Sequence, residues 1–168
     1  IHCASFSEQH FLESELFGSG KGAFQGATVS REGLLIKADG GTVILEEVAE
    51  LSLDLQAKLL RYLQSGEVRR VGENVPMTSD TRVIATTEQD LEAMAKKGKF
   101  MADLFFRLNV VPIYSPSLRE RNEDIPLLIE HFVEYFSTEN NYKKRKFTPA
   151  AVELFQKYDW KGNVRELR

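Results

Sequence analysis

The sequence predicts an α/β fold with a parallel sheet, followed by a smaller helical part. Three short runs lack polar and apolar alternation and are rich in β-branched residues, which is typical of strands buried on both faces: residues 42–45, 82–86 and 110–113. Helical patterns separate these runs, and the order strand, helix, strand favours parallel pairing. No such run follows Pro116.

The helix expected after the first strand has the clearest pattern. Leucines recur along one face and Gly66 ends the pattern, with the stripe formed by Leu51, Leu55, Leu59 and Leu63. The stretch 67–81 is polar and contains Gly72 and Pro76, so we expect a hairpin or a long loop before the second strand.

Two amphipathic helices are expected in the C-terminal part. Asn122 can cap the first, whose apolar face holds Ile125, Leu128, Ile129, Phe132 and Phe136. Thr148 and Pro149 start the second, with Val152, Phe155 and Tyr158 facing inward. We therefore divide the chain into an α/β part, residues 1–118, and a helical part, residues 119–168.

Two polar features remain in the C-terminal part. Asn163 and Glu166 have the spacing of a capping box, which predicts a third helix with Asn163 as its N-cap. The basic run 143–146 lies between the first two helices, where a solvated loop is favoured over a phosphate contact.

Composition excludes several classes of protein. The chain has 168 residues, of which 42% are hydrophobic and 28% are charged, and no apolar run approaches the roughly 20 residues of a bilayer helix. The formal charge of −3 gives no overall attraction to nucleic acid. Cys3 is the single cysteine, which excludes an internal disulfide and a cysteine-based zinc site and favours a cytoplasmic location.

Glycines cluster between Gly18 and Gly26, and Gly20 with Lys21 invites comparison with a phosphate-binding loop. The comparison fails, because a Walker A loop needs glycine where Glu15 stands and Ser or Thr where Gly22 stands. A flexible loop with Phe24 near its tip remains. Phe24 either contacts a partner protein or folds back onto the core.

Glu46 and Glu47 follow the first predicted strand directly. Ligands of open α/β sheets bind beyond the carboxyl ends of the strands, where this pair is expected to lie. One carboxylate could hold Mg²⁺ while its neighbour orients a water for attack on a phosphate. The alternative for an isolated acidic pair is a solvated turn.

Several separated motifs, in order, resemble the AAA+ ATPase domain of sigma-54-dependent transcriptional activators, the NtrC-like enhancer-binding proteins. Residues 13–18 and 22–27 resemble the family's ESELFG and GAFTGA segments, and residues 40–47 are similar to its Walker B strand. Residues 104–113 with 118–121 resemble its arginine-finger region, and residues 160–167 resemble the start of its sensor II helix. The resemblance covers essentially the whole chain.

The resemblance implies a fold and a set of roles. The fold is a parallel-sheet AAA+ core followed by a partial helical lid, and Glu47 and Arg107 are the catalytic positions, with Arg107 reaching the ATP of a neighbouring subunit. Glu46 takes the Mg²⁺ position, and Glu88 and Arg165 take nucleotide-sensing positions. The loop that pushes on sigma-54 corresponds to Gly22, Ala23, Phe24, Gln25, Gly26 and Ala27.

Four positions depart from the family pattern. Glu46 stands where relatives have Asp, Glu88 where they have the sensor I Asn, and Met101 where they have a second arginine. Gln25 replaces the threonine of the loop. The longer Glu46 side chain fits magnesium's octahedron less well, and a carboxylate at Glu88 opposes a nearby phosphate.

The resemblance also implies a larger assembly. The parent would be a cytoplasmic regulator of the two-component type that binds ATP and Mg²⁺, forms a ring, usually a hexamer, and remodels the sigma-54 RNA polymerase closed complex. The family's Walker A loop lies upstream of the segment that matches residues 1–4, so we expect a fragment without it that binds nucleotide poorly. DNA contact is expected only through a separate domain, and no membrane contact is expected.

Two alternatives stay open. A degenerate relative would keep the AAA+ fold as an oligomerisation and regulatory module with little hydrolysis, as Met101, Glu88 and Gln25 suggest. Another AAA+ machine would use the Phe24 loop to act on a different protein.

Overall fold

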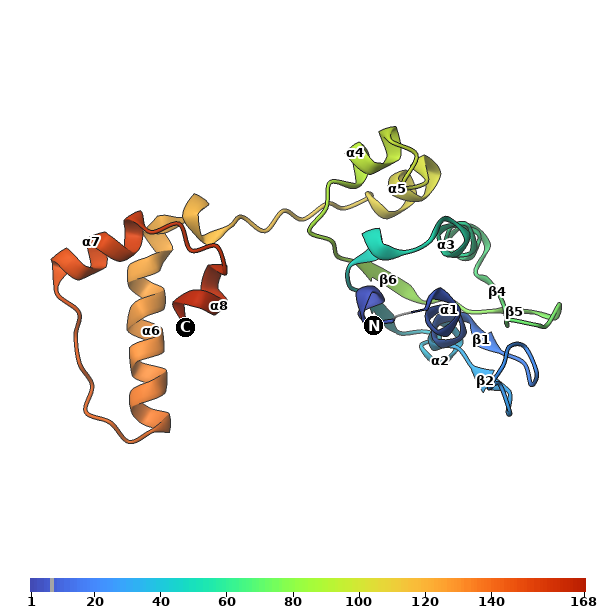
Figure 1. Ribbon diagram of the computed structural model, residues 1–168, viewed down its shortest axis with the longest axis horizontal. Helices are drawn as coiled ribbons and strands as arrows, with labels where there is room; N and C mark the ends of the chain where they lie inside the picture. The colour runs from blue at the N-terminus through green and yellow to red at the C-terminus, as the bar shows by residue number, and fades with distance from the viewer. Residues whose placement is uncertain (7) are drawn as a thin grey trace. The chain divides into compact units, whose positions relative to one another are not determined.

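The computed structural model describes residues 1–6 and 8–168, which divide into two units between Pro112 and Ile113 (Figure 1). The helices of the first unit are α1 (Gln9–Phe17), α2 (Leu34–Lys37), α3 (Leu53–Ser65), α4 (Leu91–Lys96) and α5 (Ala102–Leu108), with 3₁₀ turns at Cys3–Ser5 and Val48–Glu50. Its strands are β1 (Gly18–Ser19), β2 (Arg31–Glu32), β3 (Thr42–Leu45), β4 (Glu67–Arg69), β5 (Pro76–Thr78) and β6 (Arg82–Ala85).

The parallel pairing predicted for the first two runs is confirmed by β3 and β6. Thr42 lies opposite Arg82 and Leu45 opposite Ala85, so both strands end at the same edge. The chain start lies along the other side of β3, where His2 forms a parallel bridge with Glu46. Helix α3 connects the two strands through the hairpin, as a parallel crossover requires.

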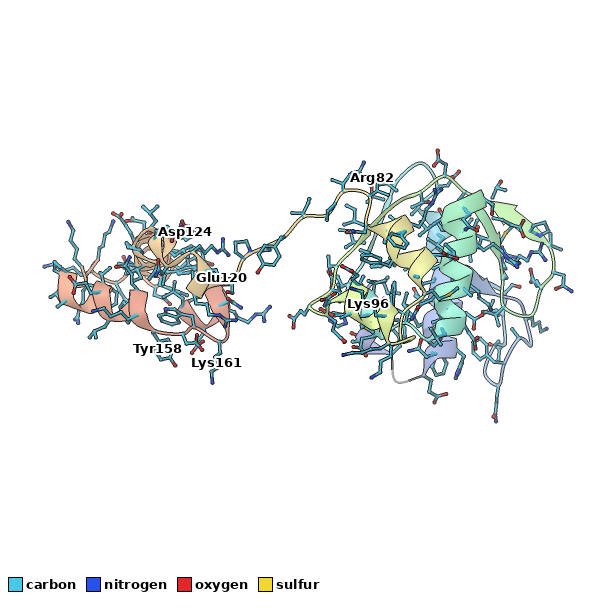
Figure 2. The ribbon with its side chains drawn as sticks, turned by 90° about the horizontal axis from the view of Figure 1, so that it is seen from above. Arg82, Lys96, Glu120, Asp124, Tyr158 and Lys161 are labelled. Atoms are coloured by element: carbon cyan, nitrogen blue, oxygen red, sulfur yellow. The ribbon has the colours of Figure 1, made fainter. Side chains whose placement is uncertain are left out.

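The strands are buried on one face only, which corrects the prediction of two buried faces. Val43 and Leu45 are 7% and 0% exposed, whereas Ile44 and Ile84 are 45% and 40% exposed. Arg82, two residues before Ile84 on the same strand, is also exposed and carries one of the side chains labelled in Figure 2. The lack of polar and apolar alternation therefore does not mean that both faces are buried, because the described helices cover only one face of the pair formed by β3 and β6.

The core of the first unit joins that buried face to the helices. Leu12 and Leu16 of α1, Leu55 and Leu59 of α3 and Leu104 of α5 pack together with it. The leucine stripe predicts α3 correctly: Ser52 caps it by accepting the Leu55 N–H, and Gly66 ends it with a left-handed φ of 69°.

The polar stretch after α3 forms a hairpin, which was one of the two predicted outcomes. Strands β4 and β5 pair antiparallel, with Val68 opposite Met77. Strands β1 and β2 form a second short antiparallel pair, in which Gly18 lies opposite Glu32.

The second unit is helical, with α6 (Ile125–Glu139), α7 (Pro149–Lys157) and α8 (Asn163–Leu167), preceded by 3₁₀ turns at Leu118–Glu120 and Asn122–Asp124. Its core contains Leu118, Ile125, Ile129 and Trp160. Thr148 caps α7 as predicted, since its hydroxyl accepts the Ala151 N–H. The basic run 143–146 is exposed, and Lys144 pairs with Glu134.

Several local predictions are wrong. Residues 110–113 form no strand, and Val110, Val111 and Ile113 are 73%, 77% and 90% exposed. Asn122 does not cap α6, because a 3₁₀ turn occupies residues 122–124 and the helix starts at Ile125. Tyr158 does not face inward: its side chain is 56% exposed (Figure 2).

Candidate functional site

The two acids that follow β3 differ in their surroundings. The side chain of Glu46 is exposed, while its backbone pairs with the chain start: its N–H donates to the Ile1 carbonyl at 2.8 Å and its carbonyl accepts the Cys3 N–H at 2.8 Å. Glu47 is half-buried at the edge where β3 and β6 end.

Glu47 lies beside the segment that follows β6. Its Oε2 accepts the backbone N–H of Glu88 at 3.4 Å. The structure thus brings together two of the predicted site positions, just beyond the ends of the neighbouring parallel strands β3 and β6, as the sheet-edge argument predicts. The Glu88 side chain itself is exposed.

The backbone of Glu47 is strained. Its φ of 55° lies in the left-handed region, which costs a non-glycine residue roughly 1–2 kcal/mol. Hydrogen bonds from the residues that follow hold it there: Val48 N–H donates to the Thr86 carbonyl at 3.0 Å, and Glu50 N–H donates to the Glu47 carbonyl at 3.0 Å. The turn leaves one carboxylate oxygen beside the Glu88 N–H, in the segment that follows β6.

These acids fit only part of a magnesium site. Within residues 1–6 and 8–168, no three His, Cys, Asp or Glu side chains gather closely enough to hold a metal ion. Mg²⁺ commonly uses one or two carboxylates and completes its shell with water and phosphate oxygens. Glu46 and Glu47 therefore suit a metal that arrives with a phosphate ligand, and not one held by protein groups alone.

Arg107 lies in the last turn of α5 and contacts α3. Its Nε and Nη2 donate to the Leu63 carbonyl at 3.2 and 2.8 Å. A cation near a helix C-terminus is favoured by the helix dipole. The guanidinium remains exposed, so further donors can serve an external anion.

Met101 precedes α5 and is half-buried. Its side chain packs against the core of the first unit, and its backbone N–H donates to the Gln56 Oε1 at 2.7 Å. The methionine that replaces the second arginine thus has a packing role.

The loop predicted to meet a partner is closed at its base. Gly22 N–H donates to the Ala27 carbonyl at 2.7 Å, and both Gly22 and Gly26 have positive φ, 80° and 104°. Phe24 is half-buried against α1, with its ring 5.1 Å from His10 and 5.9 Å from Phe11 between centroids. The loop therefore lies folded against α1.

A cavity of about 600 Å³ lies beside this contact. Phe11, Phe24 and Val29 supply apolar lining, and Glu15 pairs with Arg31 at 3.0 Å within the lining. The other residues of the loop are mostly exposed, including Gly22, Gln25 and Gly26.

Arg165 belongs to α8 of the second unit and is exposed. Asn163 is not the N-cap of that helix, which corrects the capping-box prediction, because Gly162 takes that place. Glu166 does reach back to the start of the helix, but its Oε2 accepts the Gly162 N–H at 2.8 Å and not the N–H of Asn163.

No sequence pattern pointed to Gln9, Gln56 and Gln89, whose side chains hold the segments around the acids. Gln89 Nε2, for example, donates to the Glu50 Oε1 at 2.9 Å. A single glutamine near a helix start carries no spacing rule, so only the three-dimensional structure reveals such contacts.

Comparison with known proteins assigns the family. Residues 1–114 match the model of the sigma-54 interaction domain, and residues 119–168 match that of the AAA+ ATPase lid domain. The chain belongs to the sigma-54 interaction domain family. The expected AAA+ core with a helical lid is thereby confirmed.

This sigma-54 interaction domain resembles curated regulators along nearly its whole length. It is 50% identical over 167 residues to the transcriptional regulatory protein ZraR of Escherichia coli, covering 99% of this chain and 38% of ZraR. It is 50% identical to the phenol regulator MopR of Acinetobacter guillouiae, covering 99% of this chain and 30% of MopR. The chain thus spans well under half of these relatives.

Solved structures agree with this fold. The sigma-54 interaction domain matches NtrX from Brucella abortus in complex with ADP with a TM-score of 0.86 and 37% identity, covering 99% of this chain and 36% of that one. It matches NtrX in complex with ATP with a TM-score of 0.84 and 37% identity, covering 99% and 37%. In the described part of the chain, no helix is long and apolar enough to cross a membrane.

Proposed function

We propose that this chain is the ATPase part of a longer cytoplasmic regulator that remodels the sigma-54 RNA polymerase closed complex. The observation that carries the proposal is Glu47, held in a left-handed turn at the edge where β3 and β6 end. The NtrX structures with ADP and ATP support nucleotide as the ligand. The family supports sigma-54 as the partner.

Glu47 acts as the group that orients the attacking water. A half-buried carboxylate, fixed by a backbone N–H on one oxygen, keeps the other oxygen available as an acceptor. Bound ATP with Mg²⁺ supplies the phosphate that is attacked. The exposed carboxylate of Glu46 takes the metal side of the pair, through water where its length does not match.

Arg107 of a neighbouring subunit completes the site in a ring. Arg107 is exposed on α5 and anchored to Leu63, which suits an arginine that serves the neighbouring subunit's nucleotide. Such a cation in trans makes hydrolysis depend on assembly. Arg165 senses nucleotide from the lid, and the loop from Gly22 to Ala27 contacts sigma-54 through Phe24.

The test compares ATP turnover by the full-length protein that carries this chain with turnover by its Glu47→Gln variant. We expect a loss of at least about 100-fold, since a positioned base contributes at least that much. Glu92→Gln is the matched control, because Glu92 is an exposed acid paired with Lys96 on α4. Equal turnover by the unaltered protein and its Glu47→Gln variant would reject the proposal.

A degenerate, regulatory module is the second candidate. Two observations favour it: Met101, where the resemblance implies a second arginine, packs against the core of the first unit, and Glu88, where it implies asparagine, brings a carboxyl residue next to Glu47. It predicts a full-length protein that assembles normally and binds ATP but turns it over at the background rate. Vigorous turnover with promoter melting would exclude it.

A photo-crosslinking phenylalanine analogue at position 24 tests the partner. Crosslinks to sigma-54 in a purified mixture support the assignment, with the same analogue at position 75, an exposed valine, as the control. Crosslinks only to other proteins would indicate an AAA+ machine with a different target.

A further inference from the structure

We infer that Gln9 is a positioning residue for Glu47, because its side-chain amide ties the turn that follows Glu47 to the first turn of α1. The inference rests on the catalytic role proposed for Glu47. The hydrogen bonds of the Gln9 side chain go to Glu50 and Ser52 and not to Glu47 itself.

The contact uses both ends of one planar amide. Gln9 Nε2 donates to the Glu50 carbonyl at 3.3 Å, and Gln9 Oε1 accepts the Ser52 N–H at 3.2 Å. The two backbone groups flank Leu51, which is 4% exposed and belongs to the core. The amide therefore fixes both the position and the direction of this segment relative to α1.

The segment held by Gln9 is linked rigidly to Glu47. Glu50 N–H donates to the Glu47 carbonyl at 3.0 Å, and Leu51 N–H donates to the Val48 carbonyl at 3.3 Å, which closes a short 3₁₀ turn. Glu47 is the N-cap of this turn and has a left-handed backbone. A strained residue keeps its conformation only while its surroundings hold it, so release of Glu50 loosens Glu47.

Glu50 is also held from the opposite side. Gln89 Nε2 donates to its carboxylate at 2.9 Å, from the segment after β6 that also supplies the Glu88 N–H to Glu47. Gln9 fixes the backbone of Glu50 and Gln89 fixes its side chain. The two glutamines thus hold the turn between α1 and the strand edge.

Because these groups are partly exposed, removal of the Gln9 amide should shift the turn that holds Glu47 without lowering the stability of the fold. Gln9 is half-buried, its bond to the Glu50 carbonyl is solvent-exposed and its bond from the Ser52 N–H is partly buried, so water replaces the first bond fully and reaches the second from one side when the amide is removed. We therefore expect Gln9→Ala to fold normally and to alter geometry. A misplacement of about 1 Å near a reacting group can lower a rate about 100-fold.

The experiment uses the full-length protein that carries this chain, with two independent readouts. The first is amide hydrogen exchange of the peptide covering residues 47–53, which needs no turnover. The second is kcat and KM for ATP. Gln9→Glu keeps an acceptor for the Ser52 N–H but loses the donor to the Glu50 carbonyl, and so serves as the conservative variant.

Gln156→Ala is the matched control. Gln156 Nε2 donates to the Asn122 carbonyl at 3.3 Å, the same kind of bond at the same length, in the second unit. We expect this variant to leave exchange at residues 47–53, kcat and KM unchanged.

For Gln9→Ala we expect exchange of the 47–53 peptide to rise at least about fivefold and kcat to fall about tenfold, with unchanged KM and unfolding midpoint. Gln9→Glu should give intermediate values of exchange and of kcat.

Unchanged exchange of the 47–53 peptide in Gln9→Ala overturns the inference, whatever the rate of ATP turnover. Faster exchange with normal kcat, while Glu47→Gln is inactive, overturns positioning but leaves the proposed function intact, whereas full activity of Glu47→Gln overturns both.

Discussion

The side-chain oxygen of Asn163 accepts the backbone N–H of Leu118 at 2.8 Å, which joins two segments 45 residues apart in the second unit. Leu118 is fully buried, so its N–H has little access to water. Asn163 has a φ of 54°, a left-handed conformation that asparagine tolerates better than most residues. Asn163 therefore both adopts the left-handed backbone conformation and provides the hydrogen bond that joins the two segments.

Replacement of Asn163 should destabilise the second unit in a graded way. Asn163→Ala should cost about 2 kcal/mol, from the unpaired N–H and the left-handed backbone, and Asn163→Gly about 1 kcal/mol, because glycine relieves the backbone. Asn163→Asp keeps the acceptor and should cost less than either. Urea unfolding followed by fluorescence of Trp160, the single tryptophan, measures this unit. Equal losses for Asp and Ala would show that the hydrogen bond contributes nothing.

Gln56 should be essential for the first unit. It is 0% exposed, its Nε2 donates to the Leu51 carbonyl at 2.8 Å, and its Oε1 accepts the Met101 N–H at 2.7 Å. Gln56→Leu leaves both backbone groups unpaired in the core, so we expect a loss of about 2–4 kcal/mol in the free energy of unfolding. Gln64→Leu, at an exposed position of the same helix, should change it by less than about 0.5 kcal/mol. Circular dichroism during urea unfolding measures both.

Gly33 should tolerate no side chain. An added Cβ would overlap the backbone of Phe17 and Gly18, where β2 passes the end of α1. We expect Gly33→Ala to cost about 2–4 kcal/mol or to prevent folding. Gly40→Ala, at a φ of 70° with open space around it, tests backbone strain alone and should cost about 1 kcal/mol. Similar thermal midpoints for the two variants would show that the close approach of Gly33 to the backbone of Phe17 and Gly18 has no energetic effect.

Cys3 should be inert in the folded protein. It is 1% exposed, and burial raises the pKa of its thiol from 9.0 to about 11. At pH 8 only about one thiol in a thousand is then a thiolate. We expect slow alkylation of the native chain and fast alkylation in urea; fast reaction of the native chain would show that the site opens.

The same pKa shift gives stability a pH dependence. Because the folded pKa lies above the unfolded value, the stabilisation is complete below about pH 9 and is lost as the pH rises toward 11. Cys3→Ser should lessen this alkaline loss, which unfolding curves at pH 8 and pH 10.5 would measure.

The strand prediction succeeded where a partner strand exists and failed where none does. Residues 42–45 and 82–85 pair with each other, but residues 110–113, of similar composition, remain irregular and exposed. β-Propensity describes side chains that suit a pleated surface and does not create the partner. Pairing is a tertiary event, so composition alone cannot distinguish the three runs.

The candidate site was also predicted only in part from the sequence. The strand-end rule pointed to Glu46 and Glu47 and to the edge where Glu47 meets the Glu88 backbone, and the family resemblance implied the role of Arg107. The anchoring of Arg107 by Leu63 and of the Glu47 turn by Gln9 had no sequence signal. Each joins segments more than forty residues apart through a carbonyl group, which every residue possesses.

The sequence by itself determined the α/β class, the leucine-striped helix that ends at Gly66 and the family, because these follow from local periodicity, caps and motif order. Only the tertiary structure decided which strand face is covered, that Phe24 lies against His10 and Phe11, and that Glu47 has a left-handed backbone. These features depend on groups brought together from distant segments, and no local pattern encodes the identity of a distant neighbour.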